Sequence, residues 1–160
     1  MNYSQEVIYI LDIFNEVLDR LNKINLLENK DFKINNKVFS EHWIRISLNK
    51  TNSIPIYIEI MSSEMRIDLD IAEELFQINI NDIKKDRESI ITLIKMILTS
   101  TIKMEYCGKS YRKFYFIDYK NNILDIIEYY KNTLFSLKLN CKEKIYLPIY
   151  CHVLVSLVSK

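Results

Sequence analysis

The chain of 160 residues is long enough for one domain with a substantial core, because 49% of its residues are hydrophobic. Its 22 lysines and arginines nearly balance its 21 aspartates and glutamates, so no overall charge favours nucleic acid or a membrane surface as partner. A single glycine and only two prolines exclude the glycine-rich phosphate loops of dinucleotide-binding and P-loop folds.

The first predicted element is a helix over residues 4–27. Ser4 is placed to cap it, and apolar residues recur at three- and four-residue steps from Val7 to Ile24. Glu6 and Asp12 interrupt the apolar run, which argues against a signal peptide, and no stretch reaches the roughly 18 apolar residues of a spanning helix. We therefore expect a cytoplasmic protein with no membrane partner. The polar residues 28–37 are interpreted as a connection.

Three strands are predicted next, over residues 42–48, 54–61 and 65–71. In each one, apolar and polar residues alternate with a period of two, which is typical of a strand with one buried face. Pro55 lies near the start of the second strand, where its missing N–H does not interrupt a ladder. The three segments predict an antiparallel meander.

A short helical piece is predicted over residues 72–76, followed by a long amphipathic helix from Asn81 to about residue 99. Asn81 or Asp82 is placed to cap the long helix, whose apolar stripe contains Ile90, Ile94 and Leu98. The period then falls to two, which predicts a β-hairpin over residues 101–118 with its turn at Gly108.

For the last part of the chain, the sequence leaves a choice between strands and a helix. A third helix is predicted from Asn122, because its apolar residues through Tyr130 follow helical spacing. Period-two alternation then favours strands over residues 137–141 and 145–157, about a turn at 140–144. The alternative is a final helix that begins at Pro148.

The three cysteines, Cys107, Cys141 and Cys151, are odd in number, widely spaced and without a CxxC motif. This pattern predicts neither a disulfide framework nor a zinc site. We expect reduced thiols.

Acidic residues gather around a single arginine, Arg66, on the outward side of the predicted meander and just after it. Solvation of an exposed sheet face explains them most simply. The two other interpretations are an acidic surface that binds a partner and an Asp-x-Asp site for a hard cation such as Mg²⁺. The residues in question are Glu59, Arg66, Asp68, Asp70, Glu73 and Glu74.

The predicted hairpin interleaves basic and aromatic residues. This composition suits the core, a protein interface or, as the last choice, nucleic acid. The candidate binding residues here are Tyr106, Lys109, Tyr111, Arg112 and Lys113.

Together these elements predict a single α+β domain over residues 1–160, with a mostly antiparallel sheet and helices packed on one face. No catalytic constellation, metal signature or cofactor motif is evident, which favours a binding protein over an enzyme. We therefore predict no catalytic residues, no metal ligands and no cofactor.

The strand SIPIYIEI, the acidic segment MRIDLDIAEEL and the hairpin MEYCGKSYRKFYFID carry a resemblance. In general character the chain resembles the small α+β immunity proteins of bacterial contact-dependent and polymorphic toxin systems. The resemblance implies a cytoplasmic inhibitor that occludes the active site or an exosite of a cognate toxin, and many toxins of such systems are nucleases.

Two alternatives remain open. One is a metal-dependent phosphodiesterase or nucleotidyl-transfer-like enzyme built on Glu59, Asp68 and Asp70. The other is a nucleic-acid-binding module that uses the hairpin from Lys109 to Lys113.

Overall fold

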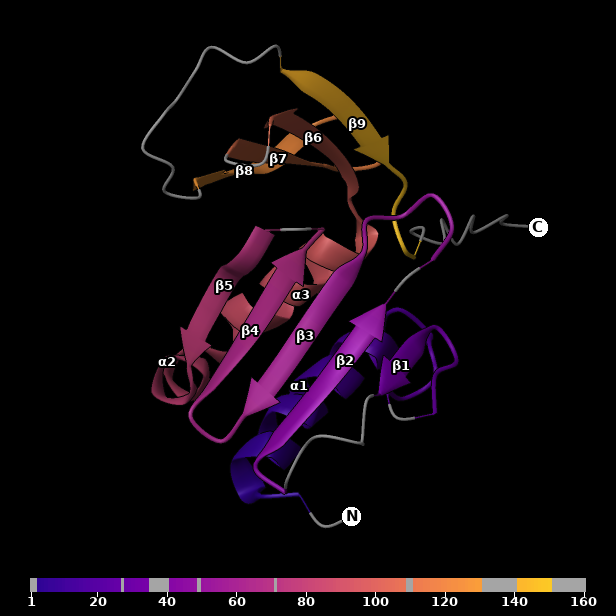
Figure 1. Cartoon of the computed structure of the whole chain (residues 1–160). Coiled ribbons are helices and arrows are strands. Elements are labelled where there is room, and N and C mark those ends of the chain that lie inside the picture. The colour runs from indigo at the N-terminus through magenta and orange to yellow at the C-terminus, as the bar shows by residue number, and fades with distance from the viewer. Residues whose placement is uncertain are drawn as a thin grey trace, which may run out of the picture.

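Figure 1 shows the computed structural model of the chain, which describes residues 3–26, 28–34, 41–48, 50–70, 72–108, 111–130 and 141–150. The backbone of Glu73 and Glu74 belongs to a strand, while their side chains fall outside the description. Within these ranges, helices and antiparallel strands form an α+β fold, which confirms the predicted fold class.

Five strands form a large antiparallel sheet in the order in which they occur along the chain. In the three central strands every second residue is a buried isoleucine, leucine or methionine, so one face of the sheet is apolar. This alternation confirms the predicted meander. The strands are β1 (Phe32–Ile34), β2 (Trp43–Leu48), β3 (Ile56–Met61), β4 (Glu64–Leu69) and β5 (Ala72–Asn79).

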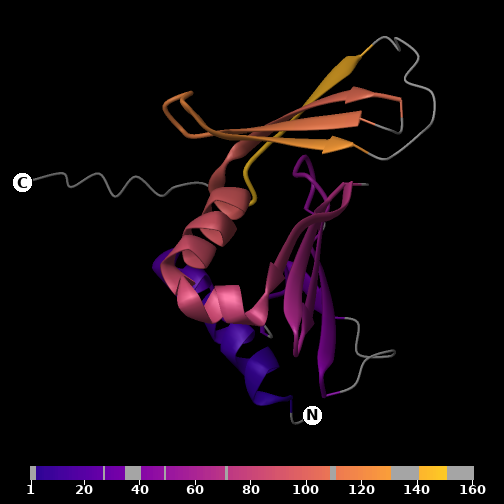
Figure 2. The same cartoon turned by 90° about the vertical axis from the view of Figure 1, so that its left-hand side faces the viewer.

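Helices cover the apolar face of the large sheet, and no described element covers its other face (Figure 2). The helix α1 (Gln5–Arg20) begins after Ser4, whose hydroxyl accepts a hydrogen bond from the Val7 N–H at 3.4 Å. It ends because Asn22 adopts a φ of 54° and the Lys23 N–H bonds back to the Leu18 carbonyl at 2.8 Å. The helix is therefore shorter than the predicted range.

The long helix predicted from Asn81 is two helices, α2 (Ile80–Lys85) and α3 (Arg87–Thr99). The cap of α2 is Asn79, and Asp86 separates the two helices. The Asp86 carboxylate accepts hydrogen bonds from the Ser89 N–H at 3.2 Å and from the Ser89 hydroxyl at 2.7 Å, so it caps α3. The predicted apolar stripe is confirmed, because Ile90, Ile91, Ile94, Ile97 and Leu98 are buried.

A second, small antiparallel sheet follows α3 directly. It lies across one end of the large sheet, as Figures 1 and 2 show from two sides. Its buried residues Ile102, Met104, Phe114 and Phe116 belong to the same core as those of the large sheet. Its strands are β6 (Thr101–Cys107), β7 (Tyr111–Ile117), β8 (Ile123–Tyr130) and β9 (Lys142–Tyr146), in the spatial order β8-β7-β6-β9.

The predicted hairpin is confirmed as β6 and β7, but two segments predicted to be helical are strands. Residues 72–76 belong to β5, which pairs with β4, and residues 123–130 form β8, which pairs with β7. Asn122 does not cap a helix. Its side-chain amide donates to Asp118 at 3.0 Å and its N–H donates to the same carboxylate at 2.8 Å, so it closes the turn between β7 and β8.

Cys107 and Cys141 form a disulfide, so the prediction of reduced thiols is wrong for these two residues. The register of β6 and β9 places Tyr106 opposite Lys142, which makes the two cysteines the next pair along the ladder, with Cα atoms 4.3 Å apart. Residues 142–144, predicted to lie in a turn, begin the strand that brings Cys141 there.

Past β9, residues 147–150 are in neither a helix nor a strand. A strand over residues 145–157, or alternatively a helix from Pro148, was predicted here. Most of this segment, Cys151 included, lies outside the described residues.

Candidate functional site

The uncovered face of the large sheet, called the open face below, carries the polar and aromatic side chains that alternate with the core residues. Three predicted binding residues, Glu59, Arg66 and Asp68, lie on it, because each is next to a buried isoleucine, leucine or methionine in its strand. The open face is defined by Trp43, Arg45, Ser47, Tyr57, Glu59, Met61, Glu64, Arg66 and Asp68 of β2, β3 and β4, with Gln77 of β5 beside Arg66.

One charge pair on the open face joins two neighbouring strands, β2 and β3. The Arg45 Nε lies 3.6 Å from Glu59 Oε1, and its guanidinium lies over the Tyr57 ring, 5.6 Å from the centroid. The cross-strand register Arg45↔Glu59 makes this contact possible.

A second cluster on the open face surrounds Glu64. Its carboxylate accepts hydrogen bonds from the Gln77 amide and from Arg66 Nε, each at 2.8 Å. The Gln77 hydrogen bond, followed by that of Arg66, holds the pKa of Glu64 below its ordinary value. The open face therefore presents paired charges beside aromatic rings, not an unbalanced acidic patch.

The other predicted acidic residues are not part of this face as described. Asp70 follows β4 in a turn, where its φ is 56° and its N–H donates to the Pro55 carbonyl at 2.9 Å. Glu73 and Glu74 lie in β5, and their side chains are outside the description. Among the residues that the structure describes, no three Asp, Glu, His or Cys side chains gather as a metal site would require.

A pocket of about 490 Å³, with Asp70 on its wall, lies where the loop before β3 meets β9. The Lys50 ammonium donates to the Ile149 carbonyl at 2.9 Å, and the Lys144 ammonium lies over the Tyr146 ring, 4.5 Å from the centroid. The hydrogen bond to Tyr146 raises the pKa of Lys144. Sequence reasoning missed this pocket, because its walls come from segments far apart in the chain.

The predicted hairpin residues divide between the two faces of the small sheet. Arg112 is only 5% exposed. It donates to the Gly108 and Tyr111 carbonyls at 2.7 Å each and lies over the Tyr106 ring, 5.2 Å from the centroid. Its guanidinium therefore holds the end of the hairpin together. Lys109 lies outside the described residues.

Tyr111 and Lys113 lie on the opposite, outer face of the small sheet. Lys113 is 2.8 Å from Glu128 of β8, whose hydrogen bond raises the pKa of Lys113. Likewise, Lys103 of β6 is 2.8 Å from Glu143 of β9. The basic character predicted for the hairpin is thus balanced by acidic residues of the neighbouring strands β8 and β9.

Exposed apolar residues gather on the small sheet and its flanking turns, a feature that the sequence did not reveal. The reason is that residues 123–130 were predicted to bury their isoleucines as a helix. The large hydrophobic side chains exposed here are Tyr119, Ile123, Leu124, Ile126, Tyr130, Ile145 and Leu147.

Comparison with known proteins gave no matching family model, no matching curated protein and no matching solved structure. No helix within the described ranges is both long enough and apolar enough to cross a membrane.

Proposed function

We propose that the protein works by binding another protein on the open face of the large sheet, and that it is not an enzyme. The observation that carries this proposal is a broad sheet face that no described element covers and on which Trp43, Tyr57 and Met61 stand among paired charges. Tryptophan, tyrosine, methionine and arginine are the residue types enriched in protein interfaces.

The arrangement of charges suggests how such a partner would be recognised. Glu59 and Glu64 each contact an arginine of the same face, so they act poorly as free stand-ins for phosphate groups. Affinity would come mainly from the aromatic anchors, and the charge pairs would give specificity.

The more specific form of the proposal is that the partner is a bacterial toxin, whose active site or exosite this protein occludes in the cytoplasm. Its support is the resemblance in character to small α+β immunity proteins. The Cys107–Cys141 disulfide counts against the cytoplasmic part of this proposal, because such bonds persist mainly in oxidising environments.

Co-expression with the product of the neighbouring gene tests the proposal. We expect that product to stop growth when it is expressed alone, and this chain to restore growth by forming a complex. Titration calorimetry on the purified pair then measures the affinity.

Tyr57→Ala identifies the surface. We expect it to weaken the complex by roughly 30-fold, or about 2 kcal/mol, the loss typical of a hot-spot residue. Tyr115→Ala is the matched control, because Tyr115 is also flanked by cations but lies on the outer face of the small sheet. Unchanged affinity in both Tyr57→Ala and Tyr57→Glu would rule the open face out.

A further inference from the structure

The strand β8 forms one edge of the small sheet, and among the described residues no strand pairs with its outer side. Its side chains are unusually apolar for such a position: Ile123, Leu124, Ile126 and Tyr130 are 57%, 53%, 44% and 66% exposed. An edge strand that exposes both apolar side chains and unpaired backbone groups is a template for another strand.

One hydrogen bond shows which backbone groups of β8 point outward. The Ile126 N–H donates to the carboxylate of Asp125 at 2.8 Å, which is a contact within β8 itself and not a rung of the ladder to β7. Because backbone groups alternate in direction along a strand, those of Glu128 point outward with those of Ile126. Asp125 therefore occupies the place where the carbonyl of an added strand would accept.

We propose that a second copy of this chain pairs along β8, antiparallel and with Ile127 on the twofold axis, so that the two small sheets join into one. In this register Ile126 of each copy lies opposite Glu128 of the other, and both positions have outward backbone groups. Each such pair exchanges two backbone hydrogen bonds.

The side chains of β8 are complementary to themselves in this register. Leu124 comes opposite Tyr130 of the second copy, which brings together two exposed apolar side chains. Asp125 comes opposite Tyr129, so its carboxylate gains a phenol as neighbour when it releases the Ile126 N–H. No carboxylate faces another carboxylate, whereas Glu128 on the axis would oppose its own copy.

The other edge of the small sheet is protected against such pairing. The strand β9 begins Lys142-Glu143-Lys144, and all three residues are exposed. Charged residues, lysine above all, are what discourages pairing at a sheet edge.

Sedimentation equilibrium of the full chain over a wide range of concentration tests the proposal. We expect a reversible dimer that Ile126→Pro weakens at least about tenfold, because proline cannot donate the bonds made on both sides of the axis. The folded monomer should tolerate this proline, because the Ile126 N–H donates to Asp125 and, in the outward direction inferred above, is not needed for the ladder to β7. Ile145→Lys, at an exposed isoleucine of β9, is the matched control and should leave the dimer intact.

A second variant reads the register directly. With Cys151 replaced by serine, Ile127→Cys should give a disulfide-linked dimer on mild oxidation, because residues on the axis lie opposite their own copies. Glu128→Cys should not. A chain that stays monomeric at all concentrations without an Ile127→Cys cross-link, or a dimer that Ile126→Pro leaves unchanged, would overturn the proposal. Neither readout depends on the proposed protein partner.

Discussion

Arg112 shows how the register of a strand decides the role of a residue. It was predicted to bind a partner with the other basic residues of the hairpin, but it lies two residues before the buried Phe114 and therefore points to the same side. The sequence held this signal, since strict alternation from Phe116 back to Arg112 places the arginine inside. The prediction followed the density of basic and aromatic residues in the hairpin and not the alternation of inward and outward positions along the strand.

We expect Arg112→Ala to lower the free energy of unfolding by roughly 2 kcal/mol, because hydrogen bonds from a charged donor to two carbonyls are lost in a buried place. Urea denaturation followed by circular dichroism measures the change. Lys113→Ala, on the outer face of the same strand, is the control and should change stability little. Equal effects of the two substitutions would contradict the buried role of Arg112.

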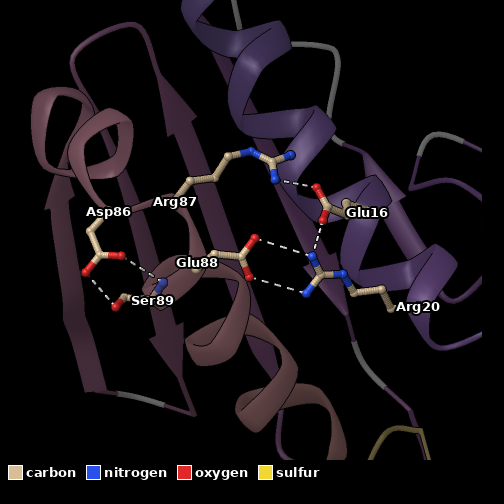
Figure 3. A network of polar contacts seen from close by, with 6 residues as sticks. All are labelled: Glu16, Arg20, Asp86, Arg87, Glu88 and Ser89. Atoms are coloured by element: carbon tan, nitrogen blue, oxygen red, sulfur yellow. Dashed lines mark hydrogen bonds and ion pairs between the residues drawn. The ribbon is translucent and has the colours of Figure 1, made fainter.

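At the scale of elements, an ion-pair network joins α1 to α3 (Figure 3). The Glu16 carboxylate of α1 accepts from Arg87 of α3 and from Arg20 one turn along α1. Arg20 in turn contacts Glu88 of α3 at 3.4 and 3.5 Å. The bond from Arg87 is the largest cause that holds the pKa of Glu16 below its ordinary value.

The sign of the pH effect follows from that lowered pKa. A carboxylate with a lower pKa in the folded than in the unfolded state stabilises the fold above its unfolded pKa. The contribution is lost as the pH falls through the folded value. We therefore expect Glu16→Gln to lower the urea midpoint near neutral pH and to differ little from the parent chain in acid.

Glu88→Gln is the control for the Glu16 prediction. The Glu88 side chain is 69% exposed and contacts only Arg20 within the network drawn in Figure 3, so the loss of its charge should have the smaller effect at neutral pH. If Glu16→Gln were as destabilising in acid as at neutral pH, packing and not charge would explain the effect of Glu16.

The elements differ in how far their sequences specify them. The central strands β2 to β4 alternate strictly, and α1 and α3 carry clear apolar stripes, so local periodicity predicts all five. The sequence of β8, ILDIIEYY, fits both periods, because its isoleucines recur at helical steps while its β-branched and aromatic residues favour a strand. Pairing with β7 decides between them, and that is a tertiary interaction.

For the candidate site, too, local periodicity predicts part of the arrangement and tertiary contacts decide the rest. Alternation alone placed Glu59, Arg66 and Asp68 on the outward side of their strands. The pairing of Glu59 with Arg45 depends on the cross-strand register of β2 and β3, which no local pattern contains. The pocket beside Asp70 depends on the packing of β9 against a loop some ninety residues earlier, so Lys50 and Lys144 gave no signal of their proximity.

At the scale of the whole molecule, the sequence does not show that the strands divide into two sheets. In the small sheet, the Cys107–Cys141 bond links β6 covalently to β9. Its two cysteines are 34 residues apart in sequence. A cross-link that closes a loop of this size stabilises the folded state mainly by reducing the conformational freedom of the unfolded chain.

We expect reduction of this bond, or Cys141→Ser, to lower the free energy of unfolding by about 3–4 kcal/mol. The loss should be greatest locally: amide hydrogen exchange in β6 and β9 should speed up more than exchange in β3 and α3, because the bond joins the former pair. Urea denaturation with and without reductant, followed by hydrogen exchange, measures both effects. Cys151→Ser leaves the bond intact and is the control. A reduced chain with unchanged stability and unchanged exchange in β9 would show that strand pairing alone holds β9 in the small sheet.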